Sequence, residues 1–331
     1  MIELNNETLV FSFPEVHAAA RLRIEFQRTL RIPDDNKTYP LPPGLGRFPL
    51  RHVDDHANRV PEDWLERGGV MLPMYQSEAM WINFRGEYPF AVKIATGKIN
   101  AVSGQPWKDK LNRNPQDYVV ATEQPWLDGY CVEKGVIRQF VAMPLGAGVT
   151  AEEQVTGKAE HGGLQIIAYP MKRKAYEKYF ASRYRGVAEE NLCVCELSAG
   201  AAMGLAPGGR MKQEIYEDEY NLADWDLEHS SRCFVHICNS VVWQDFTGWM
   251  PPTVPPTASR YNQAGLPWFD YYDEKLTAVN GIAALKKLKS VAQFDKKKGG
   301  LLPENASVNP GKVVPLFPKL KPGQVREWVG K

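Results

Sequence analysis

One stretch of the sequence decides the fold class: Ala20-Arg21-Leu22-Arg23-Ile24-Glu25-Phe26-Gln27-Arg28-Thr29-Leu30-Arg31-Ile32. Apolar side chains recur at alternate positions, and charged or polar side chains fill most of the positions between them. A repeat of two residues indicates a β-strand with one buried face and one solvent-exposed face. A helix would account for Leu22, Phe26 and Leu30, but it would misplace Ile24. We therefore predict a strand here.

Similar short runs recur along the chain, with Gly and Pro residues between them. They are Met80–Phe84, Phe90–Ile94, Ile99–Val102, Tyr118–Ala121, Val136–Met143 and Leu164–Tyr169. Long helices do not alternate with these runs, which argues against a parallel Rossmann-type sheet. We predict a mainly β protein of the β-rich α+β type, with an antiparallel β-sandwich or barrel-like core, a few peripheral helices and Pro-rich arms.

Composition divides the chain into two regions. Residues 1–248 form the predicted β-rich core, with the alternative of two packed β subdomains whose boundary lies near residues 150–190. Residues 249–331 contain the Pro-rich arm Trp249–Thr257, a predicted helix over residues 278–294 and a basic tail. From Lys286 to the end, 11 basic and 3 acidic residues give +8, against +1 for the whole chain. Such asymmetry is typical of an anion-binding tail, or of two parts of one protein that attract each other.

The composition leads us to expect a soluble protein of the cytoplasm. The first residues lack the basic start and apolar run of a secretory signal, and no apolar stretch approaches the roughly 20 residues that span a bilayer. The chain has 5 Cys. Because a disulfide framework needs secretion, we expect reduced thiols.

Three phrases of the sequence resemble a family of uncharacterised microbial proteins. They are Met74-Tyr75-Gln76-Ser77-Glu78-Ala79-Met80-Trp81, Gln139-Phe140-Val141-Ala142-Met143-Pro144-Leu145-Gly146 and Gly265-Leu266-Pro267-Trp268-Phe269-Asp270. The resemblance runs through most of the chain. It implies no activity, cofactor or catalytic residue, so the function has to be argued from the residues themselves.

The pattern His52-Val53-Asp54-Asp55-His56 is a candidate metal site. On a helix, His52 and His56 would share a face and could hold two positions on Zn²⁺ or another divalent ion. Asp55 could add an oxygen ligand or orient an imidazole. A polar loop before the helix predicted from Pro61 is the alternative, since no further ligand is evident in the sequence.

The cysteines suggest a second metal site. Cys193, Cys195, Cys233 and Cys238, with His236 between the last two, supply enough ligands for tetrahedral zinc. Zinc ribbons, however, place two residues between paired cysteines at a tight turn. Here the cysteines lie in strand-like runs, where Cys233 and Cys238 would face opposite sides. Buried free thiols are the favoured interpretation.

Two further segments have competing interpretations. The Gly-rich residues 200–210 could cradle a phosphate beside Arg210, but they lack the Lys-Ser/Thr pair of a P-loop, and we favour a wide loop between two strands. Residues 172–185 interleave basic and aromatic side chains, as nucleic-acid surfaces do. Tyr176, Phe180 and Tyr184 also fall at helical spacing, which favours a helix packed against the core.

No catalytic triad, carboxylate pair or cofactor fingerprint stands out, so whether the chain is an enzyme stays open, leaning towards no, and no cofactor is assigned. We predict a non-catalytic binding or structural module that engages other protein chains or copies of itself. Its expected binding surface consists of aromatic and basic side chains of the C-terminal region: Trp249, Trp268, Phe269, Tyr271, Lys296, Lys297 and Lys298. The first alternative is a metal-dependent, hydrolase-like enzyme that uses His52 and His56. Nucleic-acid binding through the basic segments ranks last, because the whole chain is nearly neutral.

Overall fold

The computed structural model describes residues 1–331 except 122, 181–201, 272–275, 298–302 and 317–331. The strand predicted from the alternating stretch is confirmed as β3 (Arg21–Thr29). Its apolar side chains Leu22, Ile24 and Phe26 are fully buried. Its other face is largely buried too, so the expectation of a solvent-exposed face is wrong. The reason is a hydrogen-bonded network in which Glu25 accepts from the Gln27 and Asn83 side chains.

One group of antiparallel strands surrounds β3. β2 pairs with β1 and with the first half of β3, β5 pairs with its second half, and β8 runs along its whole opposite edge. β12 pairs with the outer edge of β8. The bounds are β1 (Ile2–Asn5), β2 (Thr8–Ser12), β5 (Gly44–Arg47), β8 (Ala79–Arg85) and β12 (Trp126–Leu127).

A second group is built around β15. β15 lies between β9 and β17, and both pairings are antiparallel. β10 and β11 pair with the far edge of β9. β7 pairs in parallel with β17, and β6 pairs with β7. The bounds are β6 (Arg51–His52), β7 (Val70–Met74), β9 (Phe90–Thr96), β10 (Ile99–Asn100), β11 (Val119–Val120), β15 (Leu164–Pro170) and β17 (Ser231–Asn239).

Two long strands join the groups into a single sheet of 17 strands. β14 (Val136–Pro144) pairs with β8, and β16 (Ala202–Lys212) pairs with both β14 and β17. β13 (Gly129–Glu133) and β4 (Thr38–Tyr39) add to this junction. The two groups share one apolar core, where Phe13 and Phe90 rings lie 5.7 Å apart. The mainly antiparallel β fold is confirmed, and the pairings among the described residues do not close it into a barrel.

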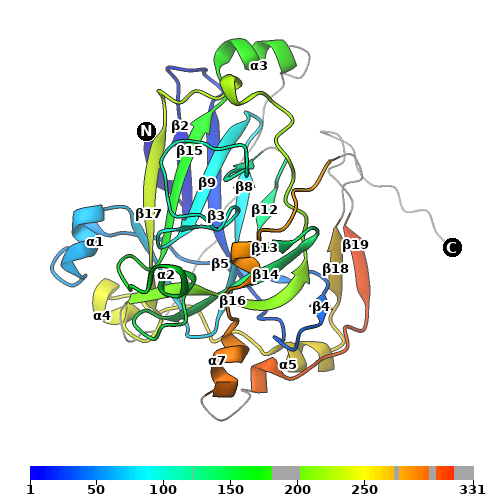
Figure 1. Ribbon diagram of the computed structural model, residues 1–331. Helices are drawn as coiled ribbons and strands as arrows, with labels where there is room; N and C mark the ends of the chain where they lie inside the picture. Colours follow the sequence, from blue (N-terminus) through cyan, green and yellow to red (C-terminus); the bar gives the residue numbers. More distant parts are fainter. Residues whose placement is uncertain (122, 181–201, 272–275, 298–302, 317–331) are drawn as a thin grey trace.

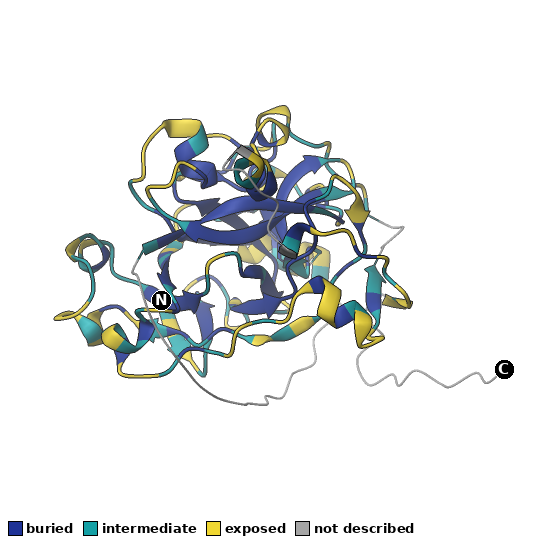
Figure 2. Ribbon diagram, turned by 90° about the horizontal axis from the view of Figure 1, so that it is seen from below, coloured by how far each residue is buried: buried dark blue, intermediate teal, exposed yellow. Residues whose placement is uncertain are grey.

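The helices are short and lie outside the strands, as predicted. Figure 1 shows α3 at the top of the molecule, α1 and α4 on the left, and α5 and α7 at the bottom, and Figure 2 shows buried strands in the middle with exposed turns and helices around them. Within the described residues, none is long and apolar enough to cross a membrane. The bounds are α1 (Glu62–Arg67), α2 (Ala151–Thr156), α3 (Arg173–Phe180), α4 (Trp243–Thr247) and α5 (Ala258–Gln263), with 3-10 turns η1 (Asp54–His56), η2 (Leu222–Asp224) and η3 (Pro303–Asn305).

The single helix expected over residues 278–294 is instead two short helices, α6 (Ala283–Lys286) and α7 (Val291–Lys297). The side-chain oxygen of Gln154 accepts from the Lys289 backbone N–H and holds the chain where it bends between them. The bend sends Leu285 into the main core and Val291 into a separate apolar cluster.

The Gly-rich residues 200–210 do not form the expected wide loop, because those from Ala202 onward belong to β16. Their register against β14 shifts between Arg138 and Phe140, where Gly208 and Gly209 lie in a bulge. A Cβ on Gly209 would come within 2.8 Å of the Ile32 side chain. The glycines thus allow other segments to approach a buried strand closely.

Part of the C-terminal region folds back onto the core. β18 (Trp268–Tyr271) pairs in parallel with β19 (Val313–Leu316). On its other side, Phe269 exchanges two backbone hydrogen bonds with Leu41. Residues 303–316 thus lie against the rest of the fold: Val308 is buried in the main core, and β19 pairs with β18.

Candidate functional site

The residues of the predicted metal site do not share a helix face. His52 is exposed at the end of β6, whereas Asp55 and His56 belong to the 3-10 turn η1. Burial and the neighbouring Arg51 lower the pKa of His56, although Asp55 opposes that shift. Within the described residues, no three His, Cys, Asp or Glu side chains come together as a set of metal ligands. The metal-centre interpretation therefore gains no support from this arrangement.

The described cysteines are buried thiols. Cys233 and Cys238 lie on β17 in different apolar clusters, as expected for opposite faces of a strand. Burial raises the pKa of Cys233 to about 12, so its thiol stays protonated at neutral pH. Between them, His236 stacks on Trp64 with ring centres 4.7 Å apart and places Nε2 3.0 Å from the Gly68 carbonyl. Cys193 and Cys195 lie outside the described residues.

The predicted binding surface is only partly exposed. Trp249 is 49% exposed, and the Arg51 guanidinium lies 5.2 Å from its ring. Trp268, in contrast, is 0% exposed and contacts the Tyr39 and Tyr261 rings, so its assignment to an exposed surface is wrong. It is buried because β18 is paired on both sides.

The remaining residues of the predicted binding surface differ in how far they are exposed. Phe269 and Tyr271, on β18, are half-buried, and Lys296 near the end of α7 is exposed. The Lys297 side chain and the whole of Lys298 lie outside the described residues. Trp249 is therefore the predicted aromatic side chain that is most available to a partner.

The segment from Trp249 to Thr257, the exposed arm, is held in place by contacts with the core. The Arg28 guanidinium donates to the Thr253 carbonyl. Arg28 is itself fixed by a buried ion pair with Glu78, with 2.7 Å between the charged atoms. Val254, next to this anchor, is 69% exposed. The arm thus combines a fixed backbone with apolar side chains that face solvent.

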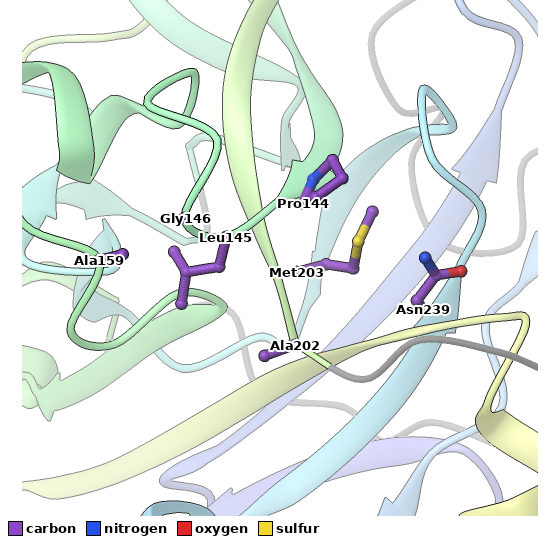
Figure 3. Close-up of a pocket in the computed structure, with 7 residues that line it drawn as sticks. All are labelled: Pro144, Leu145, Gly146, Ala159, Ala202, Met203 and Asn239. Carbon is purple, nitrogen blue, oxygen red and sulfur yellow. The ribbon is translucent and has the colours of Figure 1, made fainter.

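A cavity of about 610 Å³ lies where the ends of β14 and β17 meet the start of β16. Figure 3 shows Ala159, Leu145 and Gly146 on one side of it and Asn239 on the other, with Pro144 and Met203 between them. The Asn239 side-chain oxygen accepts from the Val241 backbone N–H. Among the described residues that line it, none has a titratable side chain, so this part of the lining suits an apolar group.

One carboxylate–imidazole pair was not anticipated from the sequence. The carboxylate of Glu152 on α2 accepts from the backbone N–H groups of His161 and Gly162, at 3.1 and 2.9 Å. The His161 Nδ1 atom is 3.5 Å from its other oxygen. Burial, reinforced by Arg67 and Lys98, lowers the pKa of His161 to about 4, so the ring is neutral at pH 7. Glu152 and His161 do not form a recognisable sequence motif. Their contacts hold α2 against the segment that precedes β15.

The basic and aromatic segment forms the predicted helix over part of its length, as α3. Tyr176 and Phe180 pack against the main core, and the Tyr176 and Tyr88 rings stack 4.2 Å apart. Residues 181–185 lie outside the described part of the chain. The aromatic side chains of α3 that pack on the core are not free to stack on bases.

Comparison with known proteins finds no matching family model, no matching curated protein and no matching solved structure. This result is consistent with the resemblance to a family of uncharacterised microbial proteins. A proposal for function therefore rests on the exposed arm, the cavities and the charged groups described here.

Proposed function

We propose that this protein is a non-catalytic binding module that engages protein chains through the exposed arm, with a second copy of itself as the partner. The exposure of Trp249 and Val254, at 49% and 69%, carries the proposal. Large apolar side chains that water surrounds gain most from burial against another chain, and Trp is the residue type most enriched among strong interface contacts.

The anchoring of the arm supports the proposal. Binding costs conformational entropy when a loop has to be ordered at the interface. The contacts of Arg28 with Thr253 and Glu78, and of Arg51 with the Trp249 ring, already order the arm before a partner arrives. An arm on each copy can contact the other in a two-fold arrangement, in which each protomer uses the same surface.

Light scattering on purified full-length protein, at low and high concentration, tests the proposal. We expect a defined oligomer that the double variant Trp249→Ala/Val254→Asp weakens or abolishes. Leu227→Asp is the matched control, because Leu227 is 47% exposed on a different segment. It should leave the oligomer unchanged. A monomer at every concentration, or equal loss in the control, would overturn the proposal.

The metal-dependent enzyme and nucleic-acid binding, the two alternatives, have no comparable support among the described residues. Among the described residues, no set of metal ligands supports the metal-dependent enzyme. Nucleic-acid binding through α3 is not supported either, because Tyr176 and Phe180 pack against the core. Elemental analysis of the same sample, with and without added Zn²⁺, is the direct test of the first. A shift assay with single-stranded oligonucleotides at low salt is the test of the second.

A further inference from the structure

Asn280 and Gly281 lie in the irregular stretch that leads into α6. Theirs is the one Asn-Gly pair in the sequence, and Asn280 is exposed. An asparagine amide can react with the backbone nitrogen of the residue that follows it. Glycine hinders this approach least, because it has no Cβ beside the nitrogen. The reaction needs no enzyme, so exposure and local freedom decide whether it occurs.

The hydrogen bonds of this stretch leave the reacting atoms free. On one side, the Val279 N–H donates to a carbonyl of the segment after β16, at 2.7 Å. On the other side, the Ile282 N–H donates to a carbonyl of β13, at 3.1 Å. Between them, the Asn280 side chain and the Gly281 N–H form no hydrogen bond with any other described residue. The nitrogen that has to attack is therefore not engaged by the part of the chain that the structure describes.

Gly281 is also the point where this stretch comes closest to β13. A Cβ at Gly281 would lie 2.2 Å from the Glu133 Cα atom, so the close approach requires glycine. Lys286 on α6 pairs with the Glu133 carboxylate at 2.7 Å, and Leu285 beside it is buried in the main core. The contact of Gly281 with Glu133 thus fixes the start of α6 against the sheet.

We propose that Asn280 is a site of spontaneous deamidation, which converts it to isoaspartate and loosens the attachment of α6. The Gly281 nitrogen attacks the side-chain carbonyl carbon of Asn280, and the new C–N bond closes a succinimide ring. The C–NH₂ bond breaks, and ammonia leaves with the proton from the backbone nitrogen. Water then opens the ring, and hydrolysis at the main-chain carbonyl leaves the chain running through the former side chain. The proposal does not rest on the self-assembly proposed above.

Isoaspartate lengthens the main chain by a methylene group and adds a negative charge. The hydrogen bonds of Val279 and Ile282 hold the two ends of the stretch, and Gly281 has no space on its β13 side. The extra length therefore displaces Gly281 from Glu133 or breaks one of the flanking hydrogen bonds. Either change weakens the attachment of α6 to β13.

Peptide mapping by mass spectrometry tests the reaction on the folded full-length protein, incubated in mildly alkaline buffer. We expect Asn280 to deamidate at least about tenfold faster than Asn58, an exposed asparagine that Arg59 follows. Electron-transfer fragmentation distinguishes isoaspartate from aspartate. Asn280→Gln, which would have to close a larger ring, should form no such product. Equal rates at Asn280 and Asn58, or reaction at Asn280 in the heat-unfolded chain alone, would overturn the proposal.

Hydrogen exchange tests the loosening, with freshly prepared Asn280→Asp as the control that adds the charge without lengthening the chain. We expect amides of α6 to exchange at least about threefold faster in the aged protein than in the fresh protein, and at the fresh rate in Asn280→Asp. Amides of β15 should not change. An isoaspartyl methyltransferase with S-adenosylmethionine, which returns isoaspartate to aspartate, should restore slow exchange. Unchanged exchange in the aged protein, or an equal change in Asn280→Asp, would overturn the loosening by the lengthened chain.

Discussion

Two tryptophans of the C-terminal region have opposite environments. Trp249 is 49% exposed at the start of the exposed arm, whereas Trp268 is 0% exposed on β18. Both follow Pro- or Gly-containing segments, and nothing next to them in the sequence separates the two. The difference comes from distant partners. Leu41 and β19 pair with β18 from either side, and Tyr39 covers the Trp268 ring. The exposure of each tryptophan thus depends on whether distant segments of the chain pack against it.

The largest expected effect is the loss of stability on removing the buried ring. We expect Trp268→Ala to lower the free energy of unfolding by about 3–5 kcal/mol, because it leaves a cavity in the core. Trp249→Ala should cost below about 1 kcal/mol, as an exposed site does. Denaturant unfolding of both variants measures the difference. Similar costs would mean that the two tryptophans are not buried differently.

A second prediction concerns how firmly the segment that carries β19 is attached to the core. The Asn305 side-chain oxygen accepts from Arg31 Nη2 at 2.7 Å, while Arg31 Nε and Nη1 have no partner among the described residues. Asn305→Ala leaves a buried guanidinium without this acceptor and should cost about 2–3 kcal/mol. Asn309→Ala, at an exposed position, is the control and should cost below about 0.5 kcal/mol. Equal stability of the two variants in thermal unfolding would contradict this attachment.

A third prediction concerns an effect that appears only at high pH and comes from a buried carboxyl. Burial raises the pKa of Asp128 from 3.8 to about 7, although a hydrogen bond from the Trp126 side chain opposes the rise. The folded chain therefore keeps this proton to a higher pH than the unfolded chain, and stability falls as the pH rises from about 4 to about 7. Asp128→Asn, which is neutral throughout, should exceed the wild type by about 4 kcal/mol at pH 8 and by little at pH 4. A gain that is the same at both pH values would contradict the assignment.

The position of β3 was predictable, but the environment of one face was not. Alternation of apolar side chains follows from the two-residue repeat of a strand and needs no knowledge of the rest of the fold. The burial of Glu25 depends on Gln27 beside it and on Asn83 of β8, which the sheet brings alongside. Polar side chains can be buried where such partners satisfy them, and the partners are not adjacent in sequence.

The candidate sites were the least predictable features. His52 and His56 are close in sequence, but a strand and a 3-10 turn separate them instead of one helix. Trp126, Glu214 and Tyr271, which line one small pocket, come from three distant segments of the chain. The spacing of these residues in the sequence does not predict that they lie together, because the pairing of strands decides which residues are neighbours.

The sequence by itself determined the class of fold, the mainly antiparallel pairing and the peripheral position of the few helices, because side-chain periodicity and Gly or Pro breaks act over a few residues. Only the tertiary structure decided which polar face is buried, which tryptophan is exposed and which carboxylate meets an imidazole, as Glu152 meets His161. Those outcomes depend on long-range pairing of strands, which brings distant segments together and sets the access of water to each side chain.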